Sequence, residues 1–176
     1  MSSERALWRI APDTPHYGAD DLSGKGAEEV GGRWNRRGTA LLYCSSSIAL
    51  ACLETLVHLV GNDSLPFNRY LVRIIVPASA WRHRTVFLPS DHVGWDSTPP
   101  GIVSLSWGND WAAATRSLIA EIPSVVVPEE ANLLINPRHR DAKRVRAQKV
   151  RRWTYDPRCD RGGCTGQVAL GKLGKC

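Results

Sequence analysis

The sequence predicts a single domain of the α+β class. The chain has 176 residues, of which 43% are apolar and 23% charged, and this is the composition of a globular domain of ordinary size. Short β-branched runs alternate irregularly with two helix-like segments, and the sequence contains no internal repeat. No run of about 18 apolar residues occurs, and no apolar segment follows the N-terminus. We therefore expect a cytoplasmic protein without a membrane span or secretory signal.

Glycine, proline and serine delimit the elements of the first half. A short strand is predicted at 8–10, before an irregular, glycine-rich stretch. The apolar run 39–43 predicts a buried strand. The three serines at 45–47 are candidate N-caps for a helix over 48–60, with Gly61 as its C-terminal stop.

The second half continues with strands that end at prolines. Residues 70–76 form a β-branched run closed by Pro77, which predicts a strand. A helix is expected over 111–121, with Asn109 or Asp110 as its cap. Strands are expected at 125–127 and 133–135. The stretch 90–107 is rich in Pro, Gly and Trp without a clear period, and we interpret it as a flap that covers a functional site.

The positive charge is concentrated in one segment. The chain carries a net charge of +6, and residues 138–152 hold eight basic residues and one acidic residue. Apolar residues within and just after this stripe are spaced by 2, 3 and 3, which predicts a twisted strand with one irregularity. A nucleic-acid-binding module using Arg138–Arg152 is one interpretation. A solvated edge strand is favoured, because no helix-turn-helix, zinc-finger or RNA-recognition motif accompanies the charge.

The five cysteines point to free thiols and to no metal site. Cys44 and Cys52 lie in apolar surroundings, and the other three lie in the last 18 residues. An odd number without a secretory signal fits a reducing compartment, and three thiols without a nearby histidine are one ligand short of a structural zinc site. We interpret 1–158 as the functional domain and 159–176 as a flexible Gly- and Cys-containing tail.

A candidate site lies on the helix predicted over 48–60. Nearly every face of this helix is apolar, which predicts burial. The exception is a narrow stripe with Ser47, Glu54 and His58, in which the last two stand at i and i+4. An unpaired carboxylate buried in the core is costly. Glu54 is therefore expected either to pair with His58 or face solvent, or to point into a pocket.

Arg33 and Tyr43 are the natural companions of Glu54 in such a pocket. Arg33 follows two glycines, where the backbone can approach a ligand closely, and Tyr43 ends a buried strand before a helix N-terminus. A guanidinium, an aromatic ring and a carboxylate can together hold the phosphate, base and ribose of a dinucleotide.

Four segments give the chain a family resemblance. They are 31–58 (from Gly-Gly-Arg-Trp-Asn to Glu-Thr-Leu-Val-His), 122–128, 132–137 and 153–158. Over residues 6 to 158 the chain resembles the RES domain, the toxin half of a bacterial Xre/RES type II toxin–antitoxin pair.

The resemblance implies a fold like that of ADP-ribosyltransferase toxins, with a central split β-sheet flanked by helices, and NAD⁺ as substrate without a metal. The family's Arg, Glu and Ser fall on Arg33, Glu54 and Ser124, with Tyr43 as aromatic partner. From the residues alone, Ser124 is an ordinary strand-start serine. Asn136 and the Trp34–Asn35 pair are expected to be scaffolding.

The expected reaction is cleavage of the nicotinamide–ribose bond. Glu54 would bind the ribose hydroxyl and stabilise the developing positive charge, while Arg33 holds a phosphate, Tyr43 stacks on the nicotinamide and Ser124 positions the substrate. Water or phosphate is the expected acceptor, which would make the protein an NAD glycohydrolase or phosphorylase. The alternative is a protein side chain as acceptor, which would make it an ADP-ribosyltransferase. A non-catalytic relative is a further alternative, against which the intact Arg33, Tyr43 and Glu54 argue.

The resemblance also implies partners. They are a helix-turn-helix antitoxin that covers the active site, and a second copy of the chain within a larger toxin–antitoxin complex. DNA would be contacted mainly through the antitoxin.

Overall fold

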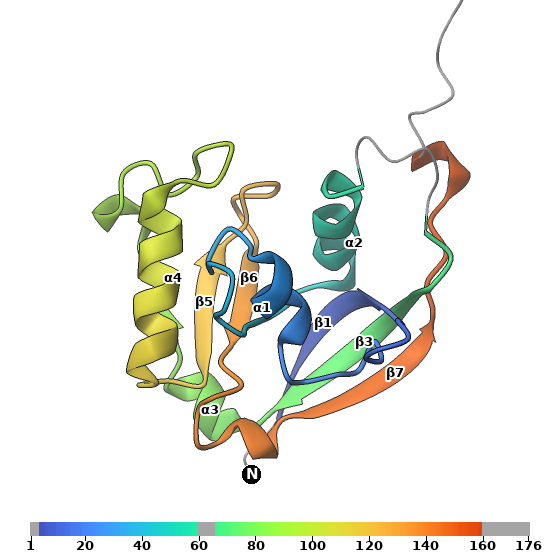
Figure 1. Ribbon diagram of the computed structural model, residues 1–176, viewed down its shortest axis with the longest axis horizontal. Helices are drawn as coiled ribbons and strands as arrows, with labels where there is room; N and C mark the ends of the chain where they lie inside the picture. The colour runs from blue at the N-terminus through green and yellow to red at the C-terminus, as the bar shows by residue number, and fades with distance from the viewer. Residues whose placement is uncertain (1–3, 60–65, 160–176) are drawn as a thin grey trace, which may run out of the picture.

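The computed structural model describes residues 4–59 and 66–159, which form one mixed sheet with helices on both faces (Figure 1). The sheet has seven strands in the order β4-β5-β6-β2-β1-β3-β7, and only the β4–β5 pair is parallel. The strands are β1 Arg5–Pro12, β2 Leu42–Ser45, β3 Arg69–Val76, β4 Thr85–Val86, β5 Ile119–Pro123, β6 Ala131–Ile135 and β7 Arg146–Arg152. The helices are α1 Lys25–Val30, α2 Ile48–Val57, α3 Ala78–Arg82 and α4 Ile102–Ala114.

The sheet is continuous but is narrowest at its centre, between β2 and β1. These strands pair at a single position, Trp8 opposite Ser45, whereas β1 and β3 pair in unbroken register from Arg5 opposite Val76 to Pro12 opposite Arg69. The α+β class is therefore confirmed, and the expected central split corresponds to this single paired position between β2 and β1.

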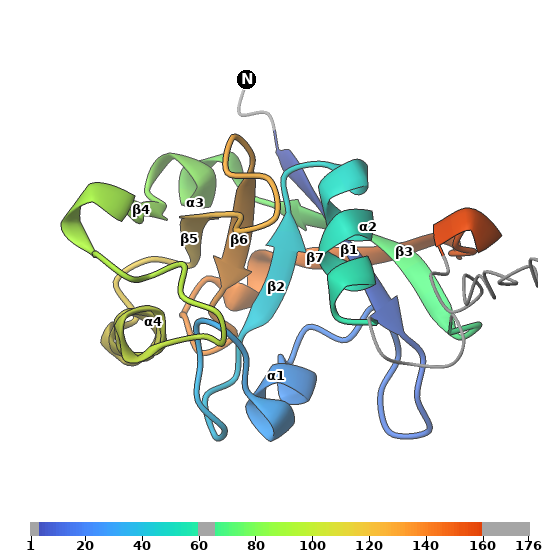
Figure 2. The same cartoon turned by 90° about the horizontal axis from the view of Figure 1, so that it is seen from above.

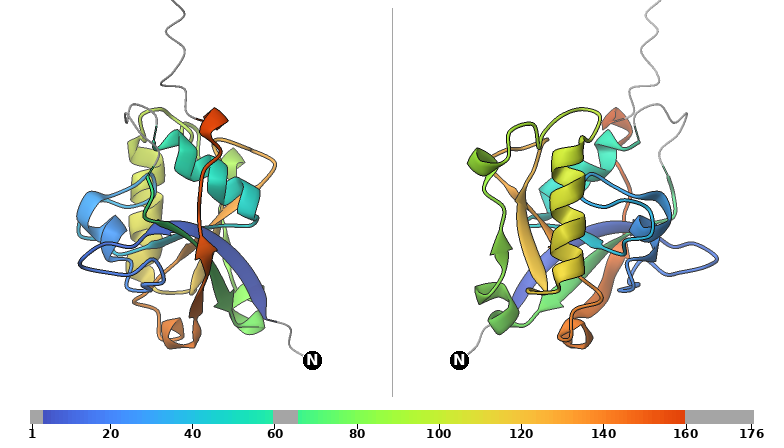
Figure 3. Two further views of the ribbon diagram at one scale, coloured as in Figure 1. Left: turned by 90° about the vertical axis from the view of Figure 1, so that its right-hand side faces the viewer. Right: turned by 60° about the vertical axis from the view of Figure 1, so that its left-hand side comes forward.

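The two faces of the sheet have different coverings. We call the face that carries α2 and α4 the helix face (Figures 2 and 3). There, α2 packs on Ile10 and Leu71, while α4 packs with Trp34 and other aromatic side chains on β5 and β6. The opposite face of β1, β3, β2 and β6 forms the largest core cluster, against which α3 and the loop before α1 pack.

The helix predicted over 111–121 is wrong in position. Helix α4 begins nine residues earlier, at Ile102, and ends at Ala114; the next residue, Thr115, caps it with a left-handed backbone of φ 48°. Residues 119–123 instead pair with β6 as strand β5. Asn109 is no cap: it lies within α4, where its side-chain oxygen accepts a hydrogen bond from Thr39 (2.7 Å).

The predicted strand at 125–127 is also wrong, because these valines form a turn after β5. The predicted strand 39–43 begins later, at Leu42, and α1 lies in the stretch expected to be irregular. Helix α2 ends at Val57, and the predicted stop at Gly61 lies outside the described residues.

The other predicted strands are confirmed. Strand β3 spans the predicted 70–76, and β6 contains the predicted 133–135. The basic stripe supplies the edge strand β7, and its pairing with β3 has the expected irregularity between Leu71 and Val72. No helix among residues 4–59 and 66–159 is long and apolar enough to cross a bilayer. The tail from residue 160 onward lies outside the described residues.

Candidate active site

Helix α2 carries the central carboxylate and begins at a side-chain cap. Ser47 is the N-cap, and its hydroxyl accepts a hydrogen bond from the backbone N–H of Leu50 (3.1 Å). The expectation of a helix buried on nearly every face is wrong: only Leu50 and Ala51 are buried, whereas Leu53 and Val57 are 42% and 45% exposed. One side of α2 therefore packs on the sheet and the other borders solvent, with Glu54 half-buried.

Glu54 is held by two side chains from other elements. The Ser124 hydroxyl donates to its Oε1 at 2.7 Å, and the Asn132 side-chain amide donates to the same oxygen. Oε2 makes no hydrogen bond with the described residues. His58 is exposed and does not pair with the carboxylate, so the alternative in which Glu54 pairs with His58 is wrong. The carboxylate is anchored through one oxygen and presents the other.

Ser124 is oriented by the turn that follows β5. Its hydroxyl oxygen accepts hydrogen bonds from the backbone N–H groups of Val126 and Val127, both at 3.0 Å. Because these two donors occupy the oxygen lone pairs, the hydroxyl proton is directed to Glu54. This fully buried serine is thus a fixed donor to the carboxylate, and the turn that replaces the predicted strand makes it one.

Asn132 is a site residue that the sequence did not single out. Its side-chain oxygen accepts a hydrogen bond from the Ser45 hydroxyl (2.8 Å), which fixes the amide so that its nitrogen faces Glu54. Ser45 and Asn132 stand directly opposite each other on β2 and β6. We refer to Glu54, Ser124, Asn132 and Ser45 as the Glu54 cluster. The sequence signals for Asn132 are its place at the start of an apolar run and at the start of the family segment 132–137.

Tyr43 lies on the same sheet face, two residues before Ser45. Its hydroxyl accepts from the backbone N–H of Trp34 (3.1 Å) and donates to the side-chain oxygen of Asn35 (2.7 Å). Burial raises the pKa of the Tyr43 hydroxyl well above its ordinary value, so the side chain stays neutral and continues to donate. A Cβ at Gly32 would lie 2.6 Å from this hydroxyl, so glycine is required there.

Arg33 reaches the loop before α4. Its Nη1 donates to the backbone carbonyls of Trp95 (3.2 Å) and Ser97 (2.8 Å), within the stretch predicted to be a flap. The structure therefore joins Glu54 and Ser124 directly and places Arg33 and Tyr43 in a neighbouring group. None of the hydrogen bonds of the described residues links the two groups.

The sequence of this domain matches a known family. The RES domain family matches residues 6–158. The chain belongs to this family. It is 55% identical to a "Prs ADP-ribosylating toxin" of Sphingobium sp. (strain YBL2), over 87% of this chain and 95% of that protein. It is 38% identical to a "Toxin Res" of Yersinia enterocolitica, over 76% and 85% of the two chains.

A solved structure shows the same fold. This RES domain superposes on one chain from the crystal structure of the M. tuberculosis MbcT–MbcA toxin–antitoxin complex, with a TM-score of 0.61. The match covers 85% of this chain and 84% of that chain, and the sequences are 15% identical.

Two asparagines of this RES domain stabilise the backbone around the site. The side-chain nitrogen of Asn35 donates to the carbonyls of Ala27 (2.7 Å) and Thr39 (2.9 Å), which closes the loop that presents Arg33. The buried Asn136 donates to the carbonyl of Ala112 (2.8 Å) and so joins the end of β6 to α4. Both contacts are consistent with scaffolding. The described part of the chain holds no group of three or more His, Cys, Asp or Glu side chains arranged for a metal ion.

Proposed function

We propose that this RES domain is a toxin that cleaves the nicotinamide–ribose bond of NAD⁺ and transfers the ADP-ribose to a protein side chain. The observation that carries the cleavage is the carboxylate of Glu54, which is anchored through Oε1 and presents Oε2. A protein acceptor is favoured by the name of the Sphingobium relative. The sequence alone placed water or phosphate first as acceptor, and the relative at 55% identity reverses that order.

The chemistry requires one well-placed anion. As the C1′–N bond breaks, its electron pair goes to the nicotinamide nitrogen, which leaves neutral, and positive charge develops on the ribose. A leaving group that departs neutral needs no general acid, unlike the leaving group in glycoside hydrolysis. Oε2 of Glu54 would bind a ribose hydroxyl and stabilise this charge. The acceptor nucleophile would then bond to C1′ and lose its proton.

The other side chains would bind and orient NAD⁺. Arg33 would exchange two neutral backbone carbonyls for a phosphate, because a guanidinium binds an anion more strongly, and with two parallel hydrogen bonds, than it binds a neutral acceptor. Tyr43, fixed through its hydroxyl, would stack its ring on the nicotinamide. Ser124 and Asn132 would hold Glu54 in place as positioning residues.

The proposal includes a protein that neutralises the toxin. The fold neighbour was solved as a toxin–antitoxin complex, which supports an antitoxin partner. We propose a helix-turn-helix antitoxin that covers the Glu54 cluster, a pair of toxin chains within the complex, and DNA contact mainly through the antitoxin.

The direct test is to identify the reaction products by mass. The purified chain would be incubated with NAD⁺ and purified Prs protein, with and without phosphate. We expect free nicotinamide and Prs that carries ADP-ribose. ADP-ribose alone would show a glycohydrolase, and its phosphorylated form a phosphorylase. Unchanged NAD⁺ would contradict all three activities.

A further inference from the structure

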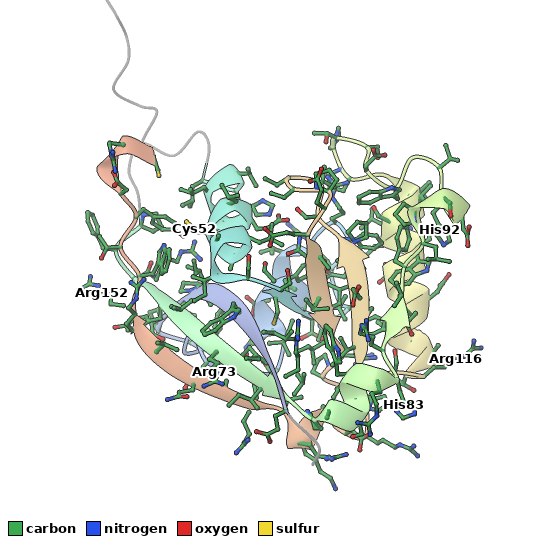
Figure 4. The ribbon with its side chains drawn as sticks, turned by 180° about the vertical axis from the view of Figure 1, so that it is seen from behind. Cys52, Arg73, His83, His92, Arg116 and Arg152 are labelled. Atoms are coloured by element: carbon green, nitrogen blue, oxygen red, sulfur yellow. The ribbon has the colours of Figure 1, made fainter. Side chains whose placement is uncertain are left out.

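Part of the helix face of the sheet has no covering among the described residues. Helix α2 covers Ile10 and Leu71, and Trp8, the next position on the same face of β1, packs partly against that cluster. Arg73, which stands opposite Trp8 on β3, lies beyond the cluster. Arg73 is exposed on this uncovered part of β3 (Figure 4). We call this surface the Arg73 face. It consists of Trp8, Arg73, Ile75, Arg146 and Gln148, which share one side of β1, β3 and β7.

The Arg73 face is continuous with the Glu54 cluster. Asn132, Ser45, Trp8, Arg73 and Gln148 stand directly opposite one another across five neighbouring strands. They form one transverse row on the helix face, with the Glu54 carboxylate bound at one end. Three strand spacings of roughly 4.8 Å place the Arg73 backbone about 14 Å from that of Asn132. A protein that reaches Glu54 with one side chain can therefore contact Arg73 with the surface around it.

The chemistry of this face fits a protein surface with acidic side chains. Trp8 and Ile75 are half-exposed apolar groups near its centre, and tryptophan and arginine are the residues most enriched at binding hot spots. Arg146 is bound to Glu4. None of the hydrogen bonds or ion pairs of the described residues involves the side chain of Arg73, so its guanidinium is available to a carboxylate.

A nucleic acid fits this face less well. Backbone phosphates are bound by a line of several unengaged cations. On the Arg73 face, Arg73 alone has no partner among the described residues, and the neighbouring Arg151 is stacked on Trp153 (4.5 Å from the ring centroid). The four cations that the basic stripe places on β7 are thus engaged by contacts within the chain.

We propose that the Arg73 face binds an acidic surface of the protein that accepts ADP-ribose, with Arg73 as the central contact. This inference rests on the proposed transfer to a protein. It assigns acceptor recognition to strands β1, β3 and β7 and leaves bond cleavage to the Glu54 cluster, so the two activities should separate under mutation.

The test compares Arg73→Glu with Arg116→Glu. Arg116 is a matched control, because it is exposed and lies on the opposite side of the molecule (Figure 4). Two rates are measured with NAD⁺: nicotinamide release without acceptor, and ADP-ribose transfer to purified Prs protein. For Arg73→Glu we expect unchanged release and a loss of about 10-fold or more in kcat/KM for Prs. Arg116→Glu should leave both rates within about 2-fold of wild type. Raising the salt concentration should raise the KM for Prs in wild type and lower it in Arg73→Glu, because salt screens an attraction in the first and a repulsion in the second.

The outcomes separate the inference from the function beneath it. If wild type transfers ADP-ribose to Prs and Arg73→Glu does so at an equal rate, the role of the Arg73 face is overturned and the proposed transferase activity stands. Nicotinamide release by wild type without any transfer to Prs would overturn the proposed transferase and the inference together. Binding of random duplex DNA by wild type that is lost in Arg73→Glu, with transfer unchanged, would assign the face to nucleic acid and overturn the inference.

Discussion

The Glu54 cluster and the edge strand β7 use polar side chains in opposite ways. In the cluster, a few side chains bind one another across β2, β6, α2 and the turn after β5, and the serines are buried. Along β7, six of seven residues are exposed, and the charges pair with partners at the protein surface. The cluster holds one anion in a fixed geometry, whereas the edge carries many charges held loosely.

This difference shows why the concentration of charge is a poor guide to the reaction. The stripe supplies the net charge of the whole chain, but its ion pairs are solvated and of small effect. In the cluster, each hydrogen bond orients the next group, from Ser45 to Asn132 and from Asn132 to Glu54. Preorganised groups of this kind contribute most to catalysis.

The largest effect is expected from Glu54→Gln. This substitution keeps the shape of the side chain but removes the negative charge, so nicotinamide release should fall about 10²- to 10³-fold. The matched control is Glu130→Gln. The Glu130 carboxylate also accepts a hydrogen bond from a serine of the same region, Ser47 (2.7 Å), and this variant should release nicotinamide within about 3-fold of the wild-type rate. Release and the unfolding midpoint are both measured. Near-wild-type release by a folded Glu54→Gln would contradict the assignment.

An intermediate effect is expected from Asn132→Ala. The substitution leaves Glu54 charged but removes one of its two donors, so a loss of about 10- to 100-fold in kcat, with a small change in KM for NAD⁺, is expected. Ser45→Ala is the graded control: it removes only the group that orients Asn132 and should cost a few-fold. If both variants lost the same activity in proportion to lost stability, Asn132 would be structural rather than positioning.

The smallest effect is expected at the edge, from Lys149→Met. The hydrogen bond from Lys149 lowers the pKa of the Asp13 carboxyl. The pair therefore stabilises the fold above the ordinary pKa of an aspartate, and this contribution is lost as the pH falls through the lowered value. Lys149→Met should lower the unfolding midpoint slightly at pH 7, and the difference should vanish in acid.

Lys143→Met removes an exposed charge on the preceding segment and serves as the control, which should have no such pH dependence. A difference between Lys149→Met and wild type that persists in strong acid would show that Lys149 acts through packing and not through Asp13.

Local patterns in the sequence predicted the elements whose signals are local. The β-branched run of β3 and the serine cap of α2 are of this kind. The boundary between α4 and β5 was missed because β5 is defined by its pairing with β6, and no local period marks it. The valines after β5 have strand propensity, but two of their amides bind Ser124 instead.

The same distinction explains what was predicted of the site. The sequence indicates Glu54 as a lone carboxylate on an apolar helix, and family resemblance indicates Ser124. Asn132 was missed because its partner lies 78 residues away. Only the register of β2 against β6 reveals that Asn132 faces Ser45 and the carboxylate.

The proposed role of Asn132 is to act on the reaction through Glu54. The decisive measurement is the rate of nicotinamide release from NAD⁺ by the double variant Glu54→Gln/Asn132→Ala, compared with the rates of the two single variants. If the residues form one unit, the double variant should release nicotinamide within about 3-fold of the rate of Glu54→Gln alone. A further loss of about 10- to 100-fold in the double variant, equal to the loss caused by Asn132→Ala alone, would show independent roles and contradict the claim.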